Sequence, residues 1–420
     1  MPWLGVRVFD LVTGSHTLSP HDHPYPVAIL AGLAILGAAY LLSVGAEVAQ
    51  VDISRSLALA FLALIAILPE YAVDMVFAWK GGDDPKNIVY ATANMTGANR
   101  LLIGLFWPVV VFVFAIRHKR DRIVLDSPFR LEIFFLLLAT AYSFTIPFRR
   151  QIHLVDFVLL ASMFVWYAIR ASKTHGDEPP HLEGVAERIA SRGKTKRRRT
   201  VLIMFGWAAI GIIAAAEPFA ESLIVTGDKL LSGLLGAEQA KFLTVQWVAP
   251  LASEFPELVV ASMFAIKAMP ESALGSLVSS KVNQWTLLIG ALPAVYVVSH
   301  MVHGHGFTWA MPLDVLQSEE IFLTSAQSLF AAILLVNLDL NVREAWVLLV
   351  LFLSQFFLPL LIPAIDLLVD VPFSAESTRV GFSAIYILLG VGVLAVSRTR
   401  RGAFIDIIRS RGAKTAVSRG

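Results

Sequence analysis

Long apolar runs dominate this sequence and constrain its fold more than any other feature. A membrane-spanning helix needs about 20 mostly apolar residues. Eleven segments have this character: roughly 27–48, 56–79, 88–116, 131–148, 153–170, 200–225, 242–267, 271–299, 319–337, 344–368 and 379–397. Only 16% of the 420 residues are charged, against about 25% in soluble domains. The sequence therefore predicts an all-α, polytopic membrane protein with about 10–11 transmembrane helices.

Charge and composition exclude several classes of function. The net charge is only +2, so no basic field favours nucleic acid as a partner. The chain contains no Cys, which excludes disulfides, thiolate metal sites and cysteine nucleophiles. The sequence also lacks a Walker phosphate loop and the His-Glu-x-x-His and Gly-x-Ser-x-Gly motifs. We therefore expect neither an ATP-driven motor nor an enzyme.

The distribution of basic residues predicts the orientation of the chain. Of its 34 Lys and Arg residues, 24 fall in loops on one side of the predicted spans and eight on the other. The positive-inside rule makes the first side cytoplasmic, so we expect an outside N-terminus and a cytoplasmic C-terminus in the plasma membrane. The expected parts are an extracytoplasmic segment 1–26, a first transmembrane repeat 27–171, a basic loop 172–199, a second repeat 200–370, an additional helix 371–397 and a basic tail 398–420.

An internal repeat indicates how the spans are organised. Segments 67–80 and 254–267 both contain Pro-Glu followed by Phe-Ala-x-Lys at the same distance, and Leu-Leu-Ile-Gly follows at 101–104 and 287–290. The two Pro-Glu motifs lie on the second and seventh spans, five spans apart, so the two copies cross the membrane in opposite directions. This pattern predicts two inverted-topology five-helix repeats, as in secondary transporters, with binding near the middle of the membrane.

The Pro-Glu motifs themselves suggest an ion site. Each proline removes a backbone N–H and leaves a carbonyl without its helical donor, and a carboxylate inside a membrane is usually paired or functional. Glu70 and Glu257 with free carbonyl oxygens would form a hard, all-oxygen site suited to Na⁺ or Ca²⁺. The alternative is structural: two proline kinks whose carboxylates form salt bridges with Arg100 and Lys281.

These motifs resemble the two alpha-repeats of the Ca²⁺:cation antiporter superfamily, the sodium/calcium exchanger type. The resemblance rests on Pro69-Glu70 with segment 91–99 and on Pro256-Glu257 with segment 273–281. It implies exchange of Ca²⁺ against Na⁺, K⁺ or H⁺ by alternating access, with no cofactor. By the same resemblance, the residues around the transported ions are Glu70, Asn94, Asn99, Glu257, Ser276 and Ser280.

The sequence departs from that family pattern where monovalent ions are expected to bind. Hydroxyl residues before the first Pro-Glu are replaced by Ala66 and Ile67, Ala98 replaces a Ser, and Lys281 replaces an Asn. Charge and proton coupling would then be tuned by Asp74, Glu254, Lys281 and Arg100. Four carboxylates and two cations leave a deficit that one Ca²⁺ or two monovalent ions would balance. We hypothesise that Lys281 substitutes for a bound Na⁺ by pairing with Glu254 or Glu257, which would favour proton-coupled exchange.

The sequence thus predicts a secondary active antiporter that exchanges Ca²⁺, or a related cation, against H⁺ or Na⁺. A Na⁺/H⁺ exchanger on the same scaffold is one alternative, and a channel-like or non-transporting membrane protein with a salt-bridged core is another. Inorganic cations and membrane lipids are the expected partners, with no protein partner evident. Glu217 and Glu221, on the span before the second Pro-Glu helix, either line an ion path or lie near water.

Overall fold

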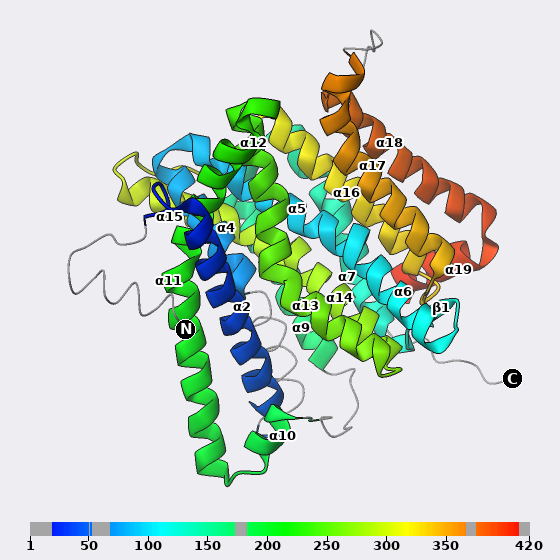
Figure 1. The fold of residues 1–420 in the computed structure, drawn as a ribbon. Helices are drawn as coiled ribbons and strands as arrows, with labels where there is room; N and C mark the ends of the chain where they lie inside the picture. The colour runs from blue at the N-terminus through cyan, green and yellow to red at the C-terminus, as the bar shows by residue number, and fades with distance from the viewer. Residues whose placement is uncertain are drawn as a thin grey trace, which may run out of the picture. The chain divides into compact units, whose positions relative to one another are not determined.

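The structure is a computed structural model that describes residues 19–49, 51–52, 68–172, 182, 184–366 and 375–410 (Figure 1). Within these ranges, eight helices are long and apolar enough to cross a membrane, or nine if the bent pair Ala240–Phe255 and Glu257–Ile266 forms one span. The predicted all-α, polytopic fold is confirmed. Most of the N-terminal segment 1–26, the start of span 56–79, part of loop 172–199, the end of span 344–368, the start of the additional helix 371–397 and the end of the tail lie outside the described residues.

Each of the eleven predicted spans overlaps at least one observed helix. The helices are α2 (Pro24–Ala49), α4 (Leu68–Asp83), α5 (Ile88–Leu101), α6 (Trp107–His118), α7 (Arg130–Ser143), α8 (Thr145–Arg149), α9 (Leu154–Ser172), α11 (Lys194–Leu235), α12 (Ala237–Leu243), α13 (Ala249–Ile266), α14 (Pro270–Asn283), α15 (Ile289–Val302), α16 (Val315–Leu335), α17 (Val342–Asp366) and α18 (Ala375–Val396). Two further helices, α10 (Val185–Ala190) and α19 (Arg398–Ser410), were not predicted.

The third and eighth spans each contain a π-helical turn at the same place in the repeat. Leu102–Phe106 joins α5 to α6, and Gln284–Leu288 joins α14 to α15. When segment 91–99 is aligned with 273–281, these two turns fall on equivalent residues. π-turns inside helices occur often at functional sites, and here both follow directly on the second motif of their repeat.

Two short β-ribbons connect loops of one repeat to loops of the other. Strand β1 (Arg122–Val124) pairs antiparallel with β4 (Asp339–Asn341), and β2 (Gln151–His153) pairs antiparallel with β3 (Ala310–Pro312). When the two repeats are aligned, β1 corresponds to β3 and β2 corresponds to β4. The β1–β4 ribbon of one arrangement is therefore equivalent to the β3–β2 ribbon when the repeats are exchanged. The ribbons therefore obey the two-fold relation that inverted repeats predict.

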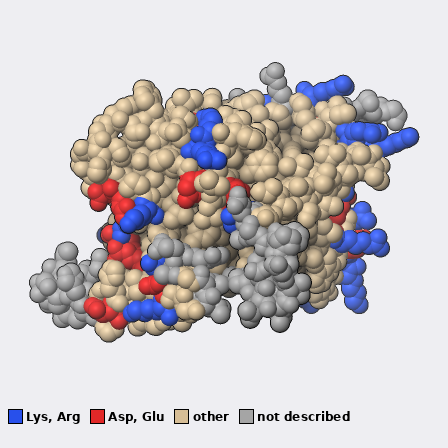
Figure 2. Space-filling view, turned by 90° about the horizontal axis from the view of Figure 1, so that it is seen from above, with Lys and Arg blue, Asp and Glu red and all other residues tan. Residues whose placement is uncertain are grey.

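By packing, the chain divides into two compact units, and each takes segments from both repeats. The first comprises Met1–Met95, Ala168–Glu257 and Val298–Phe307. The second comprises Thr96–Tyr167, Leu258–Val297 and Thr308–Gly420. Broad areas of the surface carry no charged side chain, as expected where the solvent is hydrocarbon (Figure 2). The domain boundaries expected from the sequence remain predictions.

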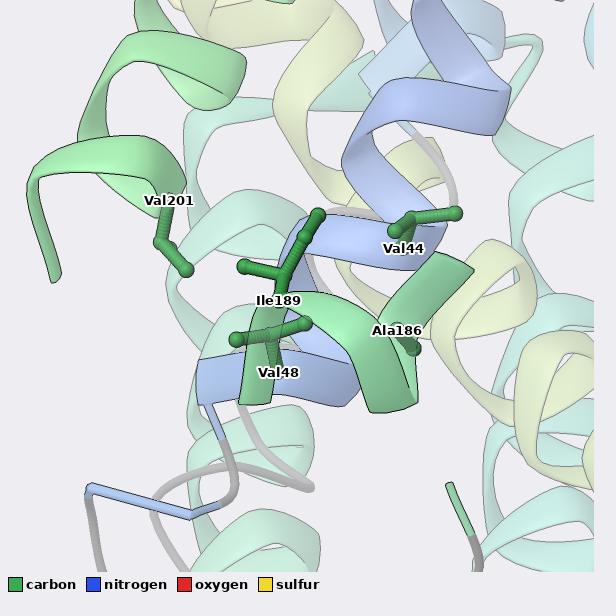
Figure 3. Close-up of a cluster of buried hydrophobic side chains, with 5 residues drawn as sticks. All are labelled: Val44, Val48, Ala186, Ile189 and Val201. Atoms are coloured by element: carbon green, nitrogen blue, oxygen red, sulfur yellow. The ribbon is translucent and has the colours of Figure 1, made fainter. Parts of the chain in front are cut away.

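In the first unit, α2 lies alongside the long helix α11 (Figure 1). The short helix α10 closes one end of this pair with an apolar cluster (Figure 3). Its Ala186 and Ile189 pack with residues of α2 and α11, namely Val44, Val48 and Val201. The cluster explains how six residues form a helix, because tertiary packing supplies the stability that so short a segment lacks by itself.

An ion pair lies beside this apolar cluster. Arg197 Nε and Nη2 donate to the two carboxylate oxygens of Asp52 at 2.9 and 2.7 Å, and Arg197 Nη1 donates to the Ala190 carbonyl at 2.9 Å. The guanidinium of Arg197 holds the pKa of Asp52 below its usual range. Arg198 Nε also lies 3.7 Å from Asp52 Oδ1, so two members of the basic run Lys194–Arg199 have a structural partner within the protein.

In the second unit, α16 packs against both α7 and α18. Ser143 of α7 and Ser325 of α16 share a hydrogen bond of 2.8 Å between their hydroxyl groups. Most side chains along α16 are buried, polar ones included. A buried polar side chain needs a partner, so α16 connects its neighbours through hydrogen bonds as well as apolar contacts.

Candidate ion-binding site

A buried pair of polar side chains joins α4 to α5. Asp74 lies one helical turn after Glu70, which puts both carboxyl groups on one face of α4, and both are buried. Asn94 Nδ2 donates to Asp74 Oδ1 at 2.8 Å. Within the described part of the chain, Asp74 Oδ2 and Asn94 Oδ1 are buried without a hydrogen-bond partner. These two oxygens are acceptors that a cation or a proton could use.

Helix α5 begins immediately after a proline-containing turn. Asp84 caps that turn by accepting a hydrogen bond from the Lys86 amide at 3.1 Å, and Pro85 follows it. This early position suits proline, because the first N–H groups of a helix have no intrahelical partner. The turn thus fixes where α5 starts and brings Asn94 level with Asp74.

The carboxylates of the second Pro-Glu motif lie on α13. Glu254 is buried and Glu257 is partly buried. The helix is bent at Pro256, as expected where a proline removes a hydrogen bond inside a helix. Around Pro69 the kink stays a prediction, because residues 53–67 lie outside the described part of the chain.

Lys281 of α14 forms a buried contact with α5. Its ammonium donates to Asn99 Oδ1 at 2.6 Å and to the Asn99 carbonyl at 3.2 Å. The same ammonium lies 4.4 Å from the centre of a Trp285 ring, in cation–π range. The structure thus shows Asn99 as a partner of Lys281, and pairing with Glu254 or Glu257 stays a prediction.

Two serines of α14 complete the predicted ligand set. Ser280 is buried, whereas Ser276 is partly buried and donates to the Ala273 carbonyl of its own helix at 3.1 Å. In the described residues, no group of three or more His, Asp or Glu side chains is placed to hold a metal ion. The assignment of Glu70, Glu257, Asn94, Asn99, Ser276 and Ser280 as ligands therefore rests on the repeat motifs and remains a prediction.

Arg100 forms a salt bridge with an acid that sequence reasoning missed. Its Nη2 contacts Glu320 Oε2 of α16, and both side chains are buried. Arg379 of α18 binds the neighbouring Glu319 at 2.7 Å and lies 4.0 Å from Glu320. The predicted charge balance counted Arg100 against the Pro-Glu region only. It must be corrected, because Glu320 compensates the charge of Arg100.

Glu320 belongs to a second sequence repeat. Asp126 is followed six residues later by Glu132-Ile133-Phe134, and Asp314 is followed at the same spacing by Glu320-Ile321-Phe322. Both glutamates are buried, on α7 and α16. Equivalent spacing continues to Arg150 and Leu338, which precede β2 and β4 and have left-handed φ angles of 51° and 64°. This repeat was the signal that could have identified both acids.

The outlying acids form two partly exposed ion pairs with one lysine. Lys80 Nζ lies 2.5 Å from Glu221 Oε1 and 3.3 Å from Glu217 Oε1. The Glu217 side chain is 57% exposed and that of Glu221 34%. Of the two readings that the sequence left open for Glu217 and Glu221, this geometry favours a location near water.

Solved structures resemble this fold. A crystal structure of the H⁺/Ca²⁺ exchanger CAX is 38% identical, with 97% of this chain and 94% of that chain covered and a TM-score of 0.84. A structure of the sodium-calcium exchanger NCX_Mj is 16% identical, with 78% of this chain and 96% of that chain covered and a TM-score of 0.52. The second likeness shows the fold alone.

Curated relatives give a shorter match. A probable potassium transport system protein Kup of Pseudomonas fluorescens (strain Pf0-1) is 28% identical over 180 residues, 40% of this chain. A protein of the same name from Bordetella avium (strain 197N) is 26% identical over 154 residues, 34% of this chain. The matched part spans only 26% and 23% of these two relatives.

The comparison with protein families covers both repeats. The profile of the sodium/calcium exchanger protein family matches residues 23–173 and 200–361, which is well over half of the chain. The match is interrupted only at the basic loop between the two predicted repeats. The chain belongs to the sodium/calcium exchanger protein family.

Proposed function

We propose that this chain is a secondary active antiporter that exchanges Ca²⁺, or a related cation, against H⁺ by alternating access. The observation that carries the proposal is the likeness, over nearly the whole chain, to the H⁺/Ca²⁺ exchanger CAX. Family membership supports the same class of function. Antiport of this kind needs no covalent step and no cofactor.

In this proposal, Glu70 and Glu257 are the central ligands of the transported cation. Asn94, Asn99, Ser276 and Ser280 supply further oxygens. The all-oxygen set suits a hard cation such as Ca²⁺ or Na⁺. The unsatisfied oxygens of Asp74 and Asn94 support the placement, because buried polar atoms without partners are rare and call for a ligand or a proton.

Proton coupling follows from the number of carboxylates. Glu70 and Asp74 share a face of α4, and Glu254 lies one turn before Glu257 on α13. Carboxylates that close do not all carry charge unless a cation is present. Protons therefore occupy some of them when Ca²⁺ is absent, and Ca²⁺ displaces those protons when it binds.

The contact between Lys281 and Asn99 supports H⁺ over Na⁺ as the counter-ion. The amide oxygen of Asn99 is one of the proposed ligands, and Lys281 donates to it at 2.6 Å. A permanent ammonium at that oxygen takes the place of a bound monovalent cation. Arg100 has a more indirect role, since Glu320 compensates its charge and it holds α5 against α16.

The same proposal sets the orientation. We place the protein in the plasma membrane with segment 1–26 outside and the basic loop 172–199 and tail 398–420 in the cytoplasm. The repeats then comprise 27–171 and 200–370, with 371–397 as an additional helix. Cations and lipids are the proposed partners.

Isotope flux in reconstituted vesicles tests the function. We expect saturable ⁴⁵Ca²⁺ uptake driven by a pH gradient, and its loss in Glu70→Gln and in Glu257→Gln. Glu217→Gln is a matched control, because the side chain of this glutamate is exposed. Parallel assays with ²²Na⁺ and ⁸⁶Rb⁺ distinguish a Na⁺/H⁺ exchanger and a K⁺ transporter. Flux that is linear in ion concentration, or no flux of any ion, would overturn the proposal.

A further inference from the structure

The repeat-related acids Glu132 and Glu320 have opposite surroundings. Glu320 forms a salt bridge with Arg100, which follows Asn99 on α5. The position equivalent to Arg100 in the other repeat is Val282, which follows Lys281 on α14. Glu320 thus has a cationic partner, whereas Val282 occupies the position that would supply one to Glu132.

Glu132 is nevertheless buried as deeply as its counterpart. Its exposed fraction is 1%. Tyr167 of α9 donates to Glu132 Oε1 at 3.5 Å, a long hydrogen bond. Among the residues that the structure describes, Glu132 Oε2 is buried without a hydrogen-bond partner, and no ion pair involves this side chain.

Several charged groups of neighbouring helices have partners elsewhere. On α16, Glu320 and Glu319 bind Arg100 and Arg379. Lys281 of α14 donates to Asn99. Arg400 of α19 contacts Glu344 and Asp339. Tyr167 is the titratable group that the structure places on the Glu132 carboxyl.

The surroundings of Glu132 favour a carboxyl group that binds and releases a proton. A buried carboxylate without a compensating cation is costly, whereas the protonated group is neutral. The first turn of a helix stabilises negative charge, and Glu132 lies in the first turn of α7. The charged form is therefore accessible as well, which a group that cycles during transport requires.

We propose that Glu132 is a second proton-binding site of the transporter, separate from the Pro-Glu carboxylates. The proton resides on Oε2 of the carboxyl. On release, the O–H bond at Oε2 breaks, the proton passes to the aqueous phase and a carboxylate is left behind, with the Tyr167 hydroxyl still donating to Oε1. The role in coupling rests on the proposed H⁺-driven function, but proton binding by Glu132 can be measured without transport.

Infrared difference spectroscopy of the purified, Ca²⁺-free protein tests proton binding directly. Besides the bands of any protonated Pro-Glu carboxyls, we expect a C=O band of a protonated carboxyl that disappears in Glu132→Gln and changes frequency in Tyr167→Phe, where its hydrogen bond is lost. Glu319→Gln is the matched control and should leave the band in place, because Glu319 is ion-paired with Arg379. The same protonated-carboxyl band in Glu132→Gln and in the wild type would overturn the proposal.

The coupling ratio of reconstituted protein provides the second measurement. Glu132→Gln keeps a neutral side chain of the same shape, so we expect it to transport with one proton fewer per Ca²⁺ than the wild type. An unchanged ratio contradicts the coupling role. If the wild type shows the band but no exchange, the proposed function fails and proton binding stands. If the wild type exchanges but its band is unaffected in Glu132→Gln, only the present proposal fails.

Discussion

Lys281 donates two hydrogen bonds to Asn99, the residue that occupies its own position in the other repeat. Two equivalent residues that touch must lie close to the local two-fold axis that relates the repeats. In the family pattern both positions are Asn, so this chain replaces one of two amides at that axis with an ammonium. The substitution removes symmetry where the ion ligands are expected.

Lys281→Asn should therefore change the counter-ion. The substitution frees Asn99 Oδ1 and adds a second amide oxygen, both suited to Na⁺. We expect Na⁺-driven Ca²⁺ flux to appear and the pH dependence of transport to weaken in vesicle assays. Lys86→Asn, at an exposed position, should leave both unchanged. Unaltered ion selectivity and pH dependence in Lys281→Asn would refute the idea that Lys281 replaces a monovalent cation.

The buried pair of Arg100 and Glu320 should show strong energetic coupling. Removing one partner of such a pair costs about 3–5 kcal/mol, because it leaves an uncompensated charge. We expect Arg100→Met to lower the free energy of unfolding by an amount near the lower end of this range. Arg379, which lies 4.0 Å from Glu320, still compensates part of the charge that Arg100 leaves behind. Adding Glu320→Gln should restore a large part of the loss. Additive effects in a double-mutant cycle, measured by unfolding in detergent, would contradict this prediction.

Backbone strain at Arg150 offers a stabilising substitution. Arg150 ends α8 with a left-handed φ of 51°, a conformation that costs a residue with a Cβ roughly 1–2 kcal/mol. Glycine removes that cost at a smaller entropic penalty, so we expect Arg150→Gly to stabilise the protein by about 0.5–1 kcal/mol. Arg150→Val should destabilise it. Equal melting temperatures for the two variants would argue against strain at this position.

The absence of Cys makes the predicted orientation easy to test. Ser191 and His305 are exposed, in loops predicted to be cytoplasmic and outside. A membrane-impermeant maleimide should label His305→Cys in intact cells and Ser191→Cys only after permeabilisation. The untouched chain is a clean control, because it contains no Cys. The opposite labelling pattern would show that the orientation is inverted.

The ion pair of Asp52 and Arg197 should contribute a pH-dependent part of stability. Arg197 lowers the pKa of Asp52 in the folded protein, whereas the pKa of an Asp in an unfolded chain is about 3.9. The stabilisation is therefore present at neutral pH and is lost as the pH falls through the acid range. We expect the wild type to lose more stability than Asp52→Asn between pH 5 and pH 3. Parallel unfolding curves across that range would contradict the prediction.

Much of the fold could be predicted because lipid imposes simple rules. Apolar runs of sufficient length must be helices, and two Pro-Glu motifs an odd number of spans apart must run in opposite directions. The structure agrees, down to π-turns that begin three residues after Asn99 and Lys281. The choice of partner for Arg100 could not be predicted, because it depends on how α16 packs against its neighbours.

The second pair of acids was missed for a related reason. Glu132 and Glu320 lie within two residues of the predicted starts of their spans, where an acid needs no function because it can reach water. Burial becomes evident only in the structure, where η3 (Ser127–Phe129) precedes α7 and where α16 begins at Val315, before the predicted start at 319. Comparing the two spans with each other would have revealed the shared Glu-Ile-Phe.

The two β-ribbons also constrain the order in which the protein assembles. Ile123 pairs with Leu340 and Ile152 with Met311, so neither ribbon can close until the ribosome has passed the corresponding residue of the second repeat. The third, fourth and fifth spans are then inserted in the bilayer while the strands that connect them, β1 and β2, are still unpaired. Truncation before Met311 should leave β1 and β2 unpaired and accessible to chaperones or proteases. The first repeat, inserted by itself, should not form a stable folded unit.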